Sequence, residues 1–210
     1  LLLLPSFENL VYNKEAKSTT HVLSNKEHMD LKDLRLFLPT VLKQNVNFVE
    51  LLFTDYYYVN NMYEEEWNKL LNAREEVARY NPARTVQAMV GIAKNKYSVF
   101  TNKKSEGFRS DLDYDPKQVY QMGRVVEFLE RYMEGKDSYA ELLKSKQRDK
   151  LLSFKRGKLS LSEAEEYMNQ EVVRVNALAD EYLKLNHKVN PEVETLLKEV
   201  VLELEKRNKK

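Results

Sequence analysis

The stretch EHMDLKDLRLFLPTVL, residues 27–42, decides the fold class, because the period of its apolar residues changes midway. Over the predicted strand Glu27–Leu31, polar His28, Asp30 and Lys32 alternate with apolar Met29 and Leu31, which is typical of a half-buried strand. From Asp33 onward apolar residues recur every three or four positions, which predicts an amphipathic helix that Pro39 kinks or shortens. With a second short strand predicted over Leu1–Leu4, this transition favours an α+β fold in which a small sheet precedes helices.

Helical signals dominate the rest of the chain. A short helix is predicted over Phe48–Phe53. An Asn or Asp oxygen can cap the first turn of a helix whose first position accepts proline, and this combination occurs at Asn81-Pro82, Asp115-Pro116 and Asn190-Pro191. The helix from Pro116 should end at Gly135.

The last two predicted helices cover about residues 162–186 and 191–207, and we expect them to pack as an antiparallel hairpin. Ser162 and Glu165 are placed to form a capping box at the start of the first. We therefore expect two domains: the C-terminal part of a sheet-containing domain over residues 1–62, and a helical domain over 63–210.

Composition excludes several classes of site. The chain has 34 Lys and Arg against 33 Asp and Glu, so its net charge of +1 creates no global attraction to nucleic acid, and any polyanion site must be local. The absence of cysteine, together with the scattered positions of His21, His28 and His187, excludes a zinc signature. The absence of cysteine also indicates a cytoplasmic setting. The apolar run Leu1–Leu4 is far too short to span a membrane.

Asp30 is the first candidate site residue. It lies on the polar face of the predicted strand between His28 and Lys32, where a carboxylate can face a metal ion. The alternative is that this alternation only marks a half-exposed amphipathic strand.

Glu50 is the second candidate, because it interrupts the apolar run of VLKQNVNFVELLFT, residues 41–54. Burial of an unpaired carboxylate costs several kcal/mol, so a partner is required if this side chain is buried. Lys43, Asn45 or a distant arginine could supply that partner and form the wall of a site. The alternative places Glu50 on the solvated stripe of a short helix.

A third candidate is the helix that follows Asp115. Lys117, Tyr120 and Arg124 recur at helical spacing and give this helix a cationic, aromatic face suited to phosphates and to stacking of a base. An ordinary exposed helix face has the same composition. No P-loop, G-x-G-x-x-G fingerprint, nucleophile elbow or H-E-x-x-H motif is present.

Five separate stretches of the sequence show a family resemblance that the spacing of residues alone does not reveal. They are EHMDLKDLRLFL, KQNVNFVELLFT, REEVARYN, YDPKQVYQMGRVVEFLERYMEG and FKRGKLSLSEAEEY, in this order. Together they resemble predicted nucleotidyltransferases of the DNA polymerase β superfamily from bacteriophages and Gram-positive bacteria. The similarity extends from about Leu4 to the C-terminal helix.

This resemblance implies a small mixed sheet, of which this chain holds a remnant, followed by a helical domain. In such enzymes a Gly-Ser turn, an Asp-x-Asp pair and a third carboxylate on a later strand hold two Mg²⁺ ions, which act on an NTP and an acceptor hydroxyl. Asp30 matches the third carboxylate, so it is the expected catalytic and metal-binding residue. The resemblance also implies nucleotide binding by Lys43, Asn45, Glu50, Lys117, Tyr120 and Arg124.

The chain departs from this family pattern in one respect. It contains no Gly-Ser turn, and no Asp-x-Asp pair precedes Asp30, where the family pattern places it; LLLLPSFENL resembles the region just after that pair. We therefore expect the missing segment to precede Leu1, and we expect this polypeptide alone to be inactive. The acceptor stays open among RNA, a nucleotide and a protein. The alternative function is a non-catalytic regulatory relative that binds a nucleotide, RNA or a protein.

Overall fold

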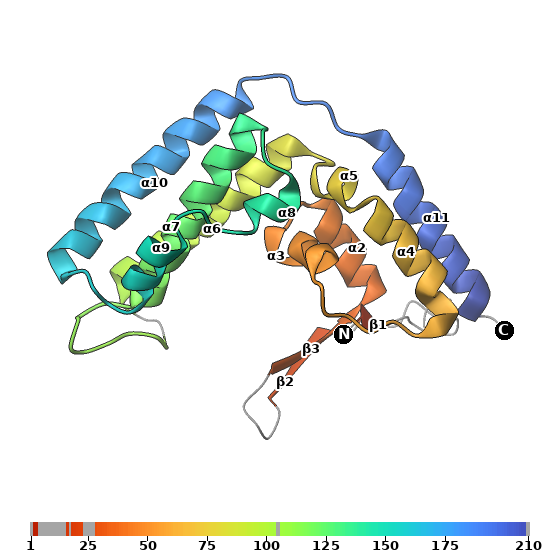
Figure 1. Cartoon of the computed structure of the whole chain (residues 1–210), viewed down its shortest axis with the longest axis horizontal. Coiled ribbons are helices and arrows are strands. Elements are labelled where there is room, and N and C mark those ends of the chain that lie inside the picture. Colours follow the sequence, from red (N-terminus) through yellow and green to blue (C-terminus); the bar gives the residue numbers. More distant parts are fainter. Residues whose placement is uncertain (1, 4–15, 17, 23–27, 104–105, 209–210) are drawn as a thin grey trace. The chain divides into compact units, whose positions relative to one another are not determined.

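The computed structural model describes residues 2–3, 16, 18–22, 28–103 and 106–208 (Figure 1). The chain forms two compact units. The first unit combines residues 1–81 with 188–210, and the second comprises residues 82–187. These units differ from the division predicted at residue 62, because the helices that directly follow that position pack within the first unit.

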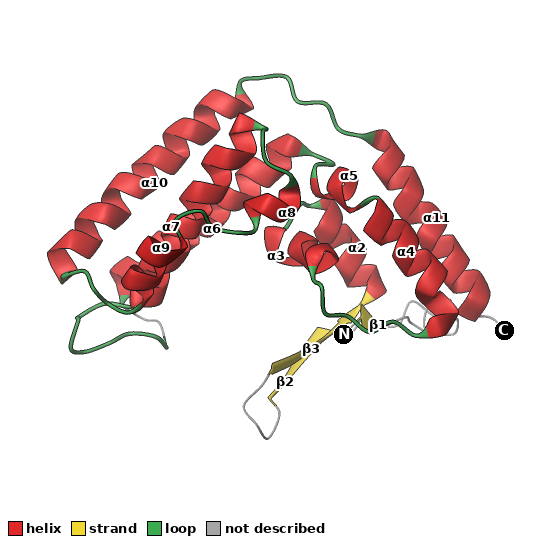
Figure 2. Ribbon diagram, in the orientation of Figure 1, coloured by secondary structure: helices red, strands yellow, loops and turns green. Residues whose placement is uncertain are grey.

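A small sheet opens the first unit. Its strand order is β1-β3-β2, with β1 at Leu2–Leu3, β2 at Ser18–Val22 and β3 at His28–Asp33. The central strand β3 is parallel to β1 and antiparallel to β2. The predicted fold class is thereby confirmed, since a small sheet precedes a mainly helical remainder (Figure 2). The strand β2 was not predicted, and all five of its residues are exposed.

The chain passes directly from β3 into helix α2, Leu34–Leu42. Asp33 caps this helix, since its carboxylate accepts a hydrogen bond from the backbone N–H of Arg35 at 2.9 Å and forms an ion pair with the Arg35 guanidinium at 2.8 Å. Pro39 lies inside the helix, as predicted, and does not end it. The predicted helix over Phe48–Phe53 is instead a pair of short elements: α3, Val46–Val49, and the 3-10 helix η1, Glu50–Phe53.

The remaining elements of the first unit are η2, Asn61–Tyr63; α4, Glu64–Asn72; α5, Arg74–Ala78; and α11, Pro191–Asn208. Helix α11 packs against α4, where Lys69 Nζ lies 2.6 Å from a Glu203 carboxylate oxygen and Arg207 Nε lies 2.5 Å from the buried Glu66 carboxylate. The structure thus packs α11 on α4 of its own unit and assigns the preceding long helix, over Leu161–Leu183, to the other unit, so it gives no support to the predicted hairpin of the last two helices.

The second unit is built on three long helices. Helices α6, Pro82–Asn102; α7, Pro116–Glu134; and α10, Leu161–Leu183, pack against one another, and the short helices α8, Tyr139–Leu142, and α9, Arg148–Lys155, pack on α7. The limits predicted for α7 are confirmed: Asp115 caps its start, and Gly135 ends it with a positive φ of 68°.

The capping box of α10 is formed two residues earlier than predicted. Ser160 and Glu163 form it, with the Ser160 Oγ accepting from the backbone N–H of Glu163 at 3.3 Å and a Glu163 carboxylate oxygen accepting from the Ser160 N–H at 2.8 Å.

A buried charged network fixes the connection from α7 to α9. Arg131 Nε donates to Asp137 at 2.6 Å, and its two terminal nitrogens donate to the carbonyl oxygens of Glu141 and Lys144, each at 2.8 Å. The buried Glu127 carboxylate accepts from the backbone N–H of Lys146 at 2.5 Å. Since these contacts span the segment just before α9, they hold the start of that helix against α7.

Candidate functional site

Asp30 lies in the middle of β3, the strand with neighbours on both sides. In the register of the sheet it is opposite Thr20 of β2. Within the described part of the chain, no group of three or more His, Asp or Glu residues is arranged to hold a metal ion. The described residues therefore do not make up the two-metal site that the family resemblance implies, and no reaction step is derived through Mg²⁺.

The segment that contains Lys43, Asn45 and Glu50 connects α2 to η1. Lys43 is exposed, and its backbone N–H donates to the Pro39 carbonyl at 3.0 Å. Asn45 caps α3, because its side-chain oxygen accepts from the N–H of Asn47 at 3.1 Å. Glu50 is half-buried at the start of η1. Helix capping thus accounts for one of the three predicted nucleotide contacts, and the roles of the other two stay predictions.

Next to this segment, Gln44 fixes the end of α2. It has a positive φ of 55°, and its buried side-chain amide donates to the carbonyl oxygens of Val41 and Val77, both at 3.0 Å. This amide joins α2 to the end of α5. At least two of the amide side chains in this segment, Gln44 and Asn45, therefore have structural roles.

The predicted cationic face of α7 is present in the second unit. Lys117 and Arg124 are exposed, and Tyr120 is half-buried between them on the same helical stripe. The ammonium of Lys155, from α9, lies 5.4 Å from the centre of the Tyr120 ring. The ring therefore already holds a cation, which adds a positive charge to this face and competes with the base stacking predicted for Tyr120.

A cation from α6 also lies near this face. The pKa of Lys96 is lowered, first because its ammonium is partly buried and next because of the positive charge of Lys117, while Asp115 opposes the effect. Cations from three helices, Lys96, Lys117 and Lys155, are thus gathered around one stripe of α7.

The segment from Lys144 to Lys158 was missed as a functional candidate. It contains seven Lys or Arg residues and a single acidic residue, Asp149. A count of charges along the sequence would have revealed it, because the net charge of the whole chain is only +1. Only the structure shows that Lys155 of this segment contacts Tyr120.

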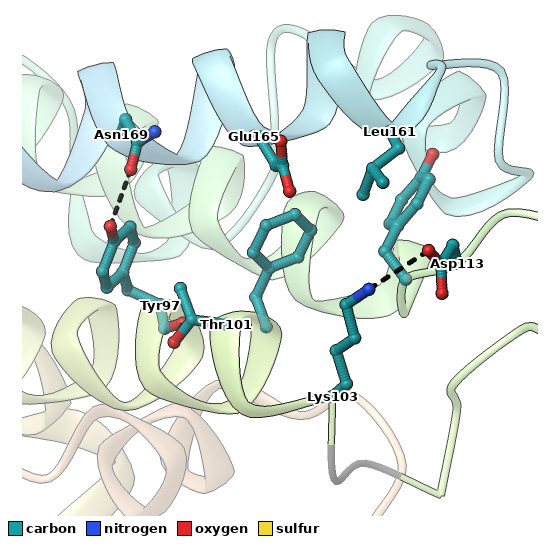
Figure 3. Close-up of a pocket in the computed structure, with 9 residues that line it drawn as sticks. Tyr97, Thr101, Lys103, Asp113, Leu161, Glu165 and Asn169 are labelled. Atoms are coloured by element: carbon teal, nitrogen blue, oxygen red, sulfur yellow. Dashed lines mark hydrogen bonds and ion pairs between the residues drawn. The ribbon is translucent and has the colours of Figure 1, made fainter.

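A cavity of about 300 Å³ lies between α6 and α10 in the second unit (Figure 3). Its walls include the tilted ring pair of Phe100 and Tyr114, whose centres are 5.8 Å apart. Most of its polar groups bind one another: Tyr97 Oη donates to Asn169 at 2.6 Å, and Lys103 Nζ lies 3.1 Å from the Asp113 carboxylate. None of the predicted site residues lines this cavity.

The predicted site residues are thus divided between the two units. Asp30, Lys43, Asn45 and Glu50 belong to the first unit, and Lys117, Tyr120 and Arg124 belong to the second. No helix in the described part of the chain has the length and apolar character needed to cross a membrane. Comparison with protein families, curated proteins and solved structures finds no match to this chain.

Proposed function

We propose that the chain takes part in nucleotidyl transfer, the movement of a nucleoside monophosphate from an NTP to an acceptor, with Asp30 as one of the carboxylates of the reaction site. The observation that carries the proposal is the position of Asp30 on the central strand β3, which runs directly into the first helix of the chain's helical part. This is the arrangement that the resemblance to nucleotidyltransferases implies for the third carboxylate.

The proposal assigns separate roles to the two units. Asp30 and the exposed cation Lys43 belong to the first unit, and Lys117 and Arg124 are candidate phosphate-binding cations on an exposed helix face of the second. An exposed ammonium or guanidinium can bind the phosphates of an NTP through charge-assisted hydrogen bonds. These assignments rest on the family resemblance and on the exposure of the three cations.

One carboxylate does not hold two divalent ions. We therefore expect that this polypeptide alone transfers no nucleotide. The test incubates the chain with Mg²⁺, labelled NTPs, and a mixed pool of RNA and protein acceptors. We expect no label in either acceptor. Label transfer that Asp30→Ala abolishes would overturn the predicted inactivity and would place a complete site within these 210 residues.

The alternative of a non-catalytic regulatory relative makes a different prediction. Such a protein would bind its nucleotide, RNA or protein ligand without any requirement for Asp30. Binding that is unchanged in Asp30→Ala, together with the absence of a Gly-Ser turn and an Asp-x-Asp pair upstream of Asp30 in any longer protein encoded with this chain, would favour that alternative.

A further inference from the structure

The strongest unassigned feature of the second unit is the positive charge of residues 144–158. With seven cations and one acid, this segment has a formal charge of +6, whereas the whole chain has +1. The rest of the chain must therefore be net negative, and the excess positive charge is concentrated in one short stretch. Such concentration is typical of a surface that binds a polyanion.

The packing of α9 exposes this charge. Leu151 and Phe154 are buried, and a methyl group at Gly123 of α7 would lie 2.4 Å from the Leu151 side chain, so the two helices are in close contact there. Arg148 and Lys155 are exposed and lie on one flank of this contact, seven residues and therefore two turns apart. The contact of Lys155 with Tyr120 places this flank beside the cationic stripe of α7.

The side chains of this flank are not neutralised locally. We define the basic surface as Tyr120 together with six exposed cations around it: Lys117, Arg124, Arg148, Lys155, Arg156 and Lys158. Lys146 of the same segment is not included, because it is paired with Asp137. Within the described part of the chain, none of these six cations forms an ion pair. Other basic residues of the second unit do so, including Arg131 with Asp137 and Arg174 with Glu130.

The cation next to the surface experiences the resulting repulsion. Lys96 has a lowered pKa, in which the positive charge of Lys117 is the second cause after burial. Like charges that are held close together cost the fold some stability, and an anionic ligand would relieve that repulsion.

The extent of the surface indicates what kind of anion fits. Arg148 and Lys155 are separated by about 10 Å along the axis of α9, a spacing that suits successive phosphates of a chain better than a single phosphate group. No large apolar side chain between Met62 and Val173 is exposed among the described residues, so the surface offers nothing to insert into a lipid bilayer. A chain of phosphates matches both observations.

We propose that the basic surface binds the phosphodiester backbone of a nucleic acid. The binding itself is independent of the transferase assignment. Its use to hold an acceptor strand rests on the proposed function, and in that case the acceptor is a nucleic acid, not a protein or a free nucleotide. RNA and DNA share the phosphate chemistry, and the experiment distinguishes them.

The test measures binding of labelled 20-nucleotide strands by fluorescence anisotropy, without NTP or Mg²⁺, between about 50 and 200 mM salt. Each phosphate contact contributes about −0.7 to the slope of log K against log salt for a single strand, so six contacts predict a slope of about −4 and about 300-fold weaker binding at the higher salt. Arms with single-stranded RNA, single-stranded DNA and duplex DNA identify the preferred strand.

Two variants with equal loss of charge separate this surface from general electrostatics. The test variant replaces Arg148, Lys155, Arg156 and Lys158 with Gln. The control replaces four exposed lysines outside the basic surface with Gln: Lys136, Lys184, Lys188 and Lys198. We expect the test variant to retain two contacts and a slope of about −1.4, and the control to retain both the affinity within about 2-fold and the slope. Circular dichroism checks that both variants are folded.

Three results would overturn the proposal: no binding of any strand by the unsubstituted chain at the lower salt, equal losses in the two variants, or preferential binding of phosphatidylserine vesicles over every strand. Because the measurement contains no NTP, a protein that fails to transfer label but shows the predicted binding refutes only the transferase assignment.

Discussion

Replacement of Gly123 by alanine tests the contact that positions the basic surface. Gly123 lies inside α7, and a Cβ atom there would be 2.4 Å from Leu151 Cδ2 and 2.9 Å from Tyr167 Oη. The Leu151 side chain is only 1% exposed, so it has little room to move away. Gly91, inside α6 of the same unit, is the matched control, because a Cβ atom there would have no neighbour within 4 Å.

Both substitutions gain the higher helix propensity of alanine, but only Gly123→Ala also overpacks a neighbouring side chain. Alanine is about 1 kcal/mol better than glycine inside a helix, so Gly91→Ala should stabilise the second unit by about that amount. At Gly123 the same gain is opposed by overpacking against Leu151, which costs about 1–3 kcal/mol. Gly123→Ala should therefore be less stable than Gly91→Ala by about 1–3 kcal/mol, since the helical gain cancels in the comparison.

Urea unfolding followed by circular dichroism at the helical band measures both variants, and hydrogen exchange of peptides from α7 and α9 locates the effect. We expect slower exchange in Gly91→Ala and faster exchange across the contact in Gly123→Ala. Equal stabilisation by the two substitutions would refute the close packing of α9 on α7, and with it the position given to the basic surface.

Three further predictions concern other parts of the chain. Arg131→Met leaves the buried acceptors of its network without their donor and should destabilise the second unit by about 3–5 kcal/mol in urea unfolding; a loss below about 1 kcal/mol would contradict the network. The pKa of Asp137 is held below its usual value by Arg131 and then Lys146, so its stabilising effect is complete above the unfolded pKa of 3.8 and disappears as the pH falls through the lower folded value. Asp137→Asn should flatten the acid side of the stability profile, and an unchanged profile would rule out this contribution. In a catalytically complete protein, Glu50→Leu should preserve the fold and change the affinity for the nucleotide. Unchanged affinity would favour the alternative, in which Glu50 only lies on the solvated side of a short helix.

Local signals in the sequence located α7 well, because its start and end each have a chemical marker. Asp115 before Pro116 satisfies the first turn, and Gly135 accepts the left-handed conformation at the end. At α10 the same reasoning chose the wrong pair by two residues. The sequence SLSEAE contains two overlapping capping boxes, starting at Ser160 and at Ser162, and spacing alone does not distinguish them.

Tertiary partners were less predictable than the helices themselves. The periodicity of residues 191–207 predicts an apolar face, but it does not identify the surface that covers this face. The structure shows α4 in that place, with Lys69 and Glu203 forming an ion pair between elements far apart in the chain. Sequence reasoning therefore located both helices but did not identify α4 as the partner of the last one.

The candidate site shows the same division between local and distant information. Helical spacing correctly placed Lys117, Tyr120 and Arg124 on one stripe of α7. It did not reveal Lys155, because that residue reaches Tyr120 from a separate helix. Asp30 was placed on a strand, as the structure confirms, but its proposed chemistry depends on further carboxylates, and the residues that the structure describes contain no metal-binding group of three His, Asp or Glu.

The most direct measurement of the central claim is nucleotide transfer by the product of the whole open reading frame that encodes this chain, with Asp30→Asn as the test variant. If Asp30 is one of the carboxylates of the reaction site, this change should reduce incorporation of label into the acceptor by more than about 100-fold. Asp180→Asn, an exposed change on α10, should leave incorporation unchanged. Transfer at the unsubstituted rate by the Asp30→Asn protein, or no transfer by the unsubstituted protein to any acceptor, would contradict the assignment.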